Sequence, residues 1–184
     1  MEREQALEHV KTNVKNKNLV KHMLAAEAVM RGLAEHFGED PDRWGLAGLL
    51  HDIDYDQTAD DPYTHSKLGA QMLQELGYDD DIAYAVKVHN DAHGYERKSL
   101  MDKALYCTDP LTGLIVASAL IHPDKKLQSI DVQFVVNRFN EKGFAKGARR
   151  EQIANCEEEL GLSLEKFIEV ALKSMQAVHR ELGL

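Results

Sequence analysis

Apolar residues recur at helical spacing along most of this chain, and this pattern predicts a protein built from helices. Between residues 17 and 37, apolar side chains return every three or four positions on one face, and Gly38 ends the run. Asp40 and Pro41 are typical of a helix start, because proline fits a first helical turn. Further helices are predicted from 40 to 51, 64 to 76, 79 to 89, 99 to 109, 111 to 120, 129 to 139, 150 to 160 and 163 to 182.

Three polar segments are predicted as loops between these helices. Residues 54–63 are acidic and include Pro62, residues 90–98 are polar, and residues 141–150 are basic and contain glycine. Residues 129–139 carry enough β-branched and aromatic residues for a strand, but a flanking cap and the lack of a partner strand favour a helix. The predicted fold is therefore all-α, a helical bundle forming one domain over residues 1–184.

Composition narrows the class of protein and its partners. The chain has 184 residues, 43% hydrophobic and 29% charged, so it is long enough to bury a core. Its net charge of −9 disfavours binding to long nucleic acid, because the phosphates repel it. A small phosphorylated molecule remains a possible partner, since a bound metal can reverse the local field.

Cysteine usage and the chain start indicate a cytoplasmic location. Cys107 and Cys156 lack CxxC spacing, which favours reduced, buried thiols. The charged N-terminus does not resemble a signal peptide, and the longest apolar run, Leu114 to Ile121, is far short of a membrane span. We therefore expect a soluble protein without a membrane partner. The sequence does not predict an oligomeric state.

The clearest candidate chemistry is the pair His51-Asp52 at the end of an apolar helix. A His-Asp dipeptide alone is weak, since a chain of this composition contains nearly one by chance. The pair gains weight from further metal-ligand types on other helices or helix ends, namely His22, His65, His89 and Asp109. Helix-borne ligands that converge in a bundle core are a known way to build a metal centre.

The chemical types of the candidate ligands limit the choice of metal ion. Imidazole and carboxylate suit Fe, Mn, Co, Ni or Zn, with Mg as a further option, and the absence of a thiolate argues against a structural zinc site. Asp52 is the natural bridge between two metals, because a carboxylate has two oxygens. Each residue also has a simpler interpretation. A lone His22 is more often a hydrogen-bonded histidine, and Asp109 could merely cap the following helix.

Four segments around these residues form a recognisable pattern. They are Leu-Leu-His-Asp-Ile-Asp at 49–54, His-Ser-Lys-Leu-Gly-Ala at 65–70, Ala-Val-Lys-Val-His-Asn at 85–90 and Lys-Ala-Leu-Tyr-Cys-Thr-Asp at 103–109. With them the chain resembles the HD superfamily of metal-dependent phosphohydrolases. Within it, the chain is similar to the group of small, stand-alone predicted hydrolases whose members have a strand-free core of this length. The resemblance implies that one metal is bound by His22, His51, Asp52 and Asp109, and that His65 and His89 complete a second metal that shares Asp52.

Two departures from this family limit what can be carried over. Many members have Gly and Lys where this chain has Asp54 and Tyr55, so a catalytic lysine is not expected there. His89 is followed by Asn90 rather than a second histidine, which weakens a match to the cyclic-dinucleotide phosphodiesterase branch. The substrate class therefore stays open.

The leading hypothesis is metal-dependent hydrolysis of a phosphomonoester or phosphodiester in a small molecule such as a nucleotide. Asp52 and Asp54 are the candidate catalytic residues, with Asp54 either supporting a ligand or transferring a proton, although a carboxylate in a loop is more often simply solvated. Candidate substrate contacts are Asn90, His93, Lys125 and Arg149, the last two from the chain's basic segments. The alternatives are a di-iron oxygenase of the same fold and a non-catalytic metal- or ligand-binding module.

Overall fold

The computed structural model describes residues 2–184, and its regular elements are all helical, which confirms the predicted fold class. The α-helices are α1 Arg3–Asn13, α2 Lys17–Phe37, α3 Pro41–Leu50, α4 Tyr55–Thr58, α5 Lys67–Glu75, α6 Asp80–Val88, α7 Leu100–Ile121, α8 Val132–Asn140, α9 Arg150–Ala154, α10 Cys156–Leu160, α11 Leu164–Ala177 and α12 His179–Leu182. Two short 3₁₀ turns, η1 Asp91–His93 and η2 Leu127–Ser129, lie between them.

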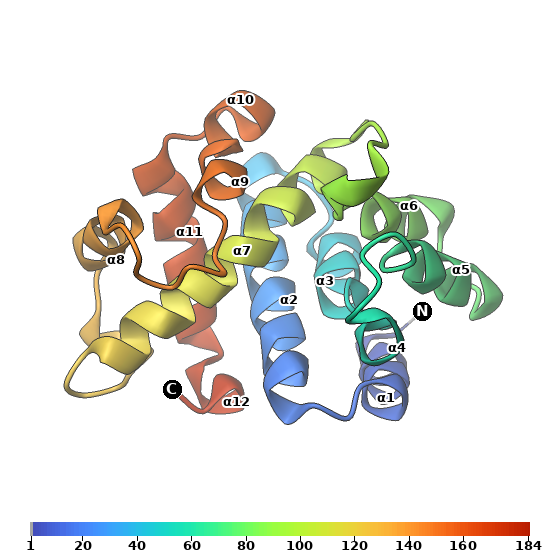
Figure 1. The fold of residues 1–184 in the computed structure, drawn as a ribbon, viewed down its shortest axis with the longest axis horizontal. Coiled ribbons are helices and arrows are strands. Elements are labelled where there is room, and N and C mark those ends of the chain that lie inside the picture. The colour runs from blue at the N-terminus through green and yellow to red at the C-terminus, as the bar shows by residue number, and fades with distance from the viewer. Residues whose placement is uncertain (1) are drawn as a thin grey trace.

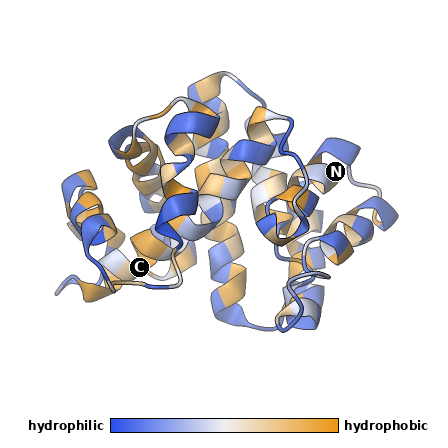
Figure 2. Ribbon diagram, turned by 45° about the horizontal axis from the view of Figure 1, so that its top comes forward, coloured by the Kyte–Doolittle hydropathy of each residue, from blue (hydrophilic) through white to orange (hydrophobic). Residues whose placement is uncertain are grey.

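Helices α2 and α7 cross at the centre of the molecule, with α3, α5 and α6 to one side and α8 to α11 to the other (Figure 1). The Asn16 side chain caps α2 by accepting hydrogen bonds from Asn18 N and Leu19 N. Gly38, at φ 73°, ends it in the left-handed conformation that glycine adopts without strain. Hydrophobic and hydrophilic residues alternate along the outer helices in Figure 2, as expected of helices with one face in the core.

The contact between α2 and α3 is unusually close, and Gly48 makes it possible. A Cβ atom at position 48 would lie 2.6 Å from the carbonyl oxygen of Ala26 and 2.8 Å from Glu27 N. These neighbouring atoms belong to the backbone of α2 and cannot move away without distorting that helix. Close packing here sets the position of His51, which directly follows α3.

Gly48→Ala is therefore expected to lower the free energy of unfolding by about 1–3 kcal/mol, because the methyl group forces the two helices apart. Urea unfolding measures the change. Gly113→Ala is the matched control, since nothing lies within 4 Å of a Cβ at that position of α7. There the same methyl group should raise stability by about 0.5–1 kcal/mol through helix propensity. Equal effects at both positions would contradict the close-contact explanation.

Helix α7 corrects one sequence prediction, because residues 99–109 and 111–120 belong to a single helix with Pro110 inside it. Proline lacks the N–H that would bond the Tyr106 carbonyl one turn earlier. The Gln152 side chain donates to that carbonyl instead, at 2.6 Å, and so satisfies the freed group. A continuous α7 is long and apolar enough to cross a membrane by length and composition. However, 67% of its apolar window is buried within the protein, as in a core helix.

Other differences from the predicted elements follow from tertiary contacts. Helix α1 was not predicted because its pattern is mostly polar, and Arg3 anchors it through an ion pair with the buried Glu27 of α2. The predicted loop 54–63 contains the short α4. The predicted helices at 150–160 and 163–182 each break once, at Asn155 and Val178. Thr64 does not cap α5, which begins at Lys67.

Candidate metal centre

Five separate elements bring the predicted ligands together. His22 comes from the first half of α2, His51 and Asp52 follow α3, and the remaining three lie in the turn before α5, directly after α6 and in the middle of α7, at His65, His89 and Asp109. The site is enclosed toward α3 and α6, where His51 and His89 are buried. It is open toward α2 and α7, where the side chains of His22 and Asp109 are 23% and 33% exposed.

The first group of donor atoms gathers around Asp52 Oδ2. His51 Nε2 lies 3.4 Å and His22 Nε2 lies 3.7 Å from this oxygen. Asp109 Oδ1 lies 3.1 Å from His22 Nε2 and 3.8 Å from His51 Nε2. These four side chains can surround one cation.

The second group gathers around the other oxygen of the same carboxylate. Asp52 Oδ1 lies 3.4 Å from His65 Nε2 and 3.7 Å from His89 Nε2. The ligand atoms of His22, His51 and Asp52 lie within 4.8 Å of one another, and so do those of Asp52, His65 and His89. Asp52 therefore stands where the sequence predicted a bridge, with one oxygen directed to each group.

Hydrogen bonds on the far side of each imidazole ring fix its tautomer. Nδ1 of His51 contacts Gly48 O at 2.8 Å, and Nδ1 of His89 contacts Val86 O at 2.6 Å. A carbonyl oxygen only accepts, so Nδ1 carries the proton in both rings and Nε2 presents a lone pair. Metal-binding histidines in proteins are generally held in this way.

The other two rings are held by side chains. Thr112 Oγ1 donates to Asp109 O at 2.9 Å, so it accepts from His22 Nδ1 at 3.0 Å. His65 Nδ1 donates to Asp54 Oδ1 at 3.0 Å. All four Nε2 atoms therefore face the centre as lone-pair donors. The sequence offered no signal for Thr112, because it lies 90 positions from the histidine that it orients.

This arrangement fits a cation. Nε2 of His22 and Nε2 of His51 lie 3.1 Å apart, and two lone pairs at that distance repel unless a cation or a proton lies between them. Burial alone would lower the pKa of His51, but the Asp52 and Asp109 carboxylates outweigh it and raise the pKa well above 6.5. Burial would conversely raise the pKa of Asp52, yet the charge of His51 holds it well below 3.8. The site thus attracts positive charge.

These pKa shifts predict how the metal-stripped protein responds to pH. A histidine whose pKa is raised by folding contributes stability below its unfolded pKa of about 6.5, and the contribution is lost as pH rises through the folded value. The pKa of Asp52 is lowered, so its contribution is present above about 3.8. The stripped protein should therefore have a higher Tm at about pH 5.5 than at about pH 8.5.

The metal-loaded protein is the control, and it should show the opposite trend. Protons compete with metals for the same imidazoles, so acid weakens metal binding and the stability that it adds. Thermal unfolding of both forms across this pH range measures the two slopes. A stripped protein that gains stability steadily toward alkaline pH would contradict the raised histidine pKa values.

Asp54 is buried, which corrects the alternative of a solvated loop carboxylate. Its Oδ2 accepts hydrogen bonds from Ser66 N at 2.8 Å and Gly69 N at 2.9 Å, and its Oδ1 accepts from His65 Nδ1. With these donors engaged, the carboxylate connects the start of α5 to His65. Of the two roles predicted for Asp54, the geometry favours support of the ligand His65 over proton transfer.

Two of the predicted substrate-binding residues, Asn90 and His93, form hydrogen bonds with the backbone near His65. The Asn90 side chain donates to Pro62 O at 2.7 Å and also lines the pocket beside His89. His93 Nε2 donates a hydrogen bond to His65 O at 2.7 Å. Unlike Asn90, His93 does not line the pocket beside His89. Both residues support the backbone around His65.

Arg149 and Lys125, the two predicted basic contacts, lie in different places. Arg149 lines a polar pocket of about 170 Å³ together with His65, His89 and Asp109. It forms two hydrogen bonds to Asp91, at 2.7 and 3.0 Å, which lower the pKa of that carboxyl. The structure does not bring Lys125 to this pocket. It follows α7, whose last 12 residues after Asp109 span about 18 Å.

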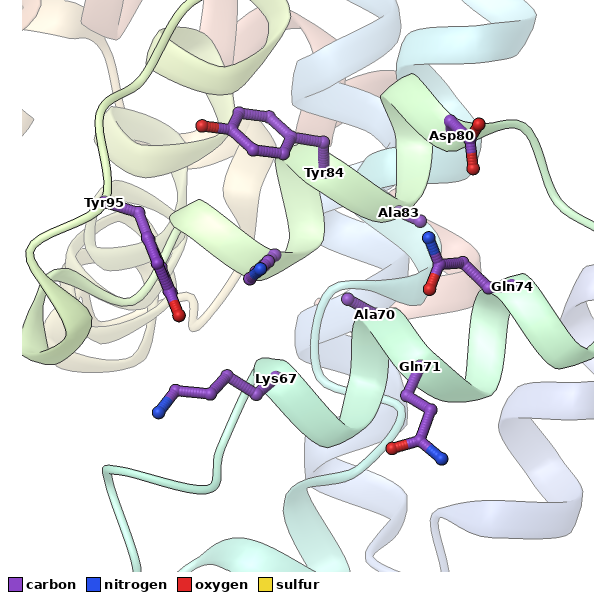
Figure 3. Close-up of a pocket in the computed structure, with 9 residues that line it drawn as sticks. Lys67, Ala70, Gln71, Gln74, Asp80, Ala83, Tyr84 and Tyr95 are labelled. Carbon is purple, nitrogen blue, oxygen red and sulfur yellow. The ribbon is translucent and has the colours of Figure 1, made fainter.

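A larger cavity, of about 500 Å³, lies between α5 and α6 (Figure 3). Lys67 and Tyr95 lie at one end, and Gln74 and Asp80 lie at the other. None of the candidate metal ligands lines it. Size therefore does not identify the functional site of this protein, whereas the convergence of donor atoms does.

This fold and cluster agree with a family comparison. The HD domain model matches residues 19–135, and the chain belongs to this family. HD domains bind divalent metals and make up a generally hydrolytic superfamily of metal-dependent phosphohydrolases. The matched range contains all six candidate ligands, while Arg149 and Gln152 lie beyond it.

Individual relatives do not narrow the activity. An uncharacterized protein of Methanocaldococcus jannaschii is 28% identical over 77% of this chain and 86% of its own length. Ribonuclease Y of Oleidesulfovibrio alaskensis is 28% identical over 53% of this chain, but over only 18% of its own length. A tRNA (cytidine(56)-2'-O)-methyltransferase of Thermoplasma volcanium is 28% identical over 72% of this chain and 39% of its length. No solved structure matches.

Proposed function

We propose that this protein is a hydrolase that cleaves a phosphate ester of a small molecule with the help of two divalent transition-metal ions. The observation that carries the proposal is the convergence of four imidazole Nε2 atoms on the two oxygens of Asp52. The donor set of histidine and aspartate, without thiolate, favours Fe, Mn, Co, Ni or Zn. His22, His51, Asp52 and Asp109 would hold one ion, and His65, His89 and Asp52 the other.

Bound divalent ions supply Lewis acidity, which neutralises phosphoryl charge and lowers the pKa of water. The side chains of the protein position the metal ligands and the phosphoryl group. Asp52 holds the two groups of ligands at a fixed separation, and Asp54 keeps the His65 ring in the tautomer that faces Asp52. Arg149 lines the pocket, where the guanidinium N–H groups that do not bind Asp91 can donate to phosphoryl oxygens. Water adds to phosphorus, the P–O bond to the alcohol breaks, and the alcohol leaves with a proton.

Charge and pocket size support a small substrate. The net charge of −9 disfavours long nucleic acid. Arg149, which forms an ion pair with Asp91, is the basic side chain that lines the pocket beside the ligands. The pocket of about 170 Å³ matches a phosphoryl group better than a polymer. We place the activity in the cytoplasm, because both cysteines are free and buried. We also propose that residues 1–184 act as one domain, since α11 packs against α2.

The test combines elemental analysis with an activity screen. Protein purified without chelator should contain up to two equivalents of a first-row metal. The metal-stripped protein should release phosphate from a member of a panel of nucleotides, sugar phosphates, aryl phosphates and alkyl phosphates only after Mn, Co, Ni, Fe or Zn is restored. A His51→Ala variant is the matched negative control. Metal binding without hydrolysis of any ester would leave a binding module, and dioxygen-dependent turnover with iron would indicate an oxygenase.

A further inference from the structure

We propose that the groove between α2 and α7 binds the alcohol part of the phosphate ester, that this part is largely apolar, and that Gly113 sets its size. The inference rests on the proposed function and adds a substrate class to it. It would make the substrate an aryl or alkyl phosphate rather than a sugar phosphate. The groove has a volume of about 430 Å³ and is separate from the polar pocket beside Arg149.

The two walls of the groove are helix faces, of which the α2 wall includes the candidate metal ligand His22 and the α7 wall follows Asp109 by one turn. On α2 the wall consists of Asn18, Lys21, His22 and Ala25, which share one face because they are three or four positions apart. On α7 the face that begins at Asp109 continues one turn later through Gly113, and then through Val116 and Leu120. The groove therefore starts at the metal centre and runs along both helices.

The far part of the groove is apolar and is lined in part by residues of and after α12. Leu182 and Leu184 line it opposite Val116 and Leu120. Leu120 and the adjacent Ile121 are 50% and 54% exposed, and they are the only large aliphatic residues classed as exposed among residues 2–184. An apolar ligand in the groove would remove Leu120 from water, which is the main source of favourable free energy for such contacts.

The groove and the polar pocket adjoin different candidate metal ligands, so each can bind a different part of the ester. His22 lines the groove, and its Nε2 lies 3.1 Å from Asp109 Oδ1, which faces the polar pocket. A phosphoryl group held near these two ligands has the polar pocket with its Arg149–Asp91 ion pair on one side, and on the other the groove, whose far part is apolar. The charged end of an ester suits the first, and an uncharged alcohol suits the second.

Gly113 is the natural probe of this channel. It is exposed on α7, and nothing lies within 4 Å of a Cβ built at this position. A larger side chain would therefore project into the open groove without displacing other atoms. Gly113→Leu should leave the fold and the metal content unchanged while it shortens the space for an apolar ligand.

The test measures binding rather than turnover, so that it succeeds or fails separately from the proposed hydrolysis. Manganese-loaded protein is titrated by calorimetry with methylphosphonate, phenylphosphonate and 1-naphthylphosphonate, which share one charged group. Wild-type affinity should rise roughly tenfold to a hundredfold from methyl to naphthyl, as expected for burial of an aromatic group. Gly113→Leu should remove most of this gain and leave methylphosphonate affinity unchanged. Leu120→Ser, which alters the opposite end, should remove part of it.

Ala117→Leu is the matched control, because it also places a leucine on α7 but at a position that does not line the groove. It should bind all three phosphonates like the wild type. Equal affinity for the three phosphonates, or the same naphthyl preference in Gly113→Leu, would overturn the proposal. Binding of 1-naphthol that leaves phosphonate affinity unchanged would also overturn it, since the groove would then be a separate ligand site. Loss of ester hydrolysis with this preference intact would refute only the proposed function.

Discussion

Asp52→Ala is expected to remove both metals and to reduce phosphate ester hydrolysis at least about a thousandfold. One carboxylate serves both groups of ligands, with Oδ2 directed at His22 and His51 and Oδ1 at His65 and His89. Its loss leaves the four imidazoles without the negative charge that joins the two groups and helps to neutralise the bound cations. Elemental analysis of the purified variant measures the metals, and phosphate release measures turnover.

The fold should survive this substitution, because Asp52 lies in a turn after α3 and the apolar core around Leu49 and Leu50 is untouched. Asp102→Ala is the control at another buried aspartate. Asp102 accepts hydrogen bonds from Lys98 N and Ser99 N at the start of α7, so its loss should cost about 1–2 kcal/mol of stability while metal content stays the same. Stoichiometric metal in purified Asp52→Ala would refute the bridge.

Asp54→Asn is expected to weaken binding of the metal ion at His65 and His89 by about tenfold to a hundredfold. Binding of the other ion should be unchanged. The amide oxygen can still accept from Ser66 N and Gly69 N, so α5 keeps its start. The amide NH₂ group, however, then faces His65 Nδ1 and cannot accept its proton. The ring loses the partner that fixes its tautomer, and Nε2 no longer presents a lone pair to Asp52.

His65→Ala provides the comparison for this prediction, because it should lose the same single equivalent of metal. Asp56→Asn is the matched control, two positions away on α4, where the exposed carboxylate contacts only Lys15 N. It should bind both metals normally. If Asp54→Asn kept full affinity at both sites, Asp54 would be a structural residue alone, and retention of both metals in His65→Ala would indicate a one-metal site.

Much of the helical framework is predictable from local sequence. The apolar period and Gly38 locate α2, and Ser99 with Asp102 forms the capping box that starts α7. Helix α8 is also predicted correctly over most of its length. Prediction fails where a distant residue decides the outcome. Pro110 remains inside α7 because Gln152 replaces the missing hydrogen bond, and α1 is anchored by Glu27.

The same division applies to the candidate site. His22, His51, Asp52, His65, His89 and Asp109 are recognisable from residue type and from the segments around them, and the structure gathers all six. Their orientation is not readable in the same way. Asp54 is buried by tertiary packing, and Thr112 orients His22 although the two lie 90 positions apart in the chain. Lys125 and Arg149 look alike as basic loop residues, yet only Arg149 lies at the site.

The sequence by itself determined the all-helical class, the family and the identity of the candidate ligands, because periodicity and residue type are local properties. Tertiary structure alone decided which oxygen of Asp52 faces which histidines, which ring nitrogen carries the proton, and where the apolar groove runs. These depend on how α2, α3 and α7 pack, and that packing is set by contacts such as Gly48 against Ala26, which join residues distant in sequence.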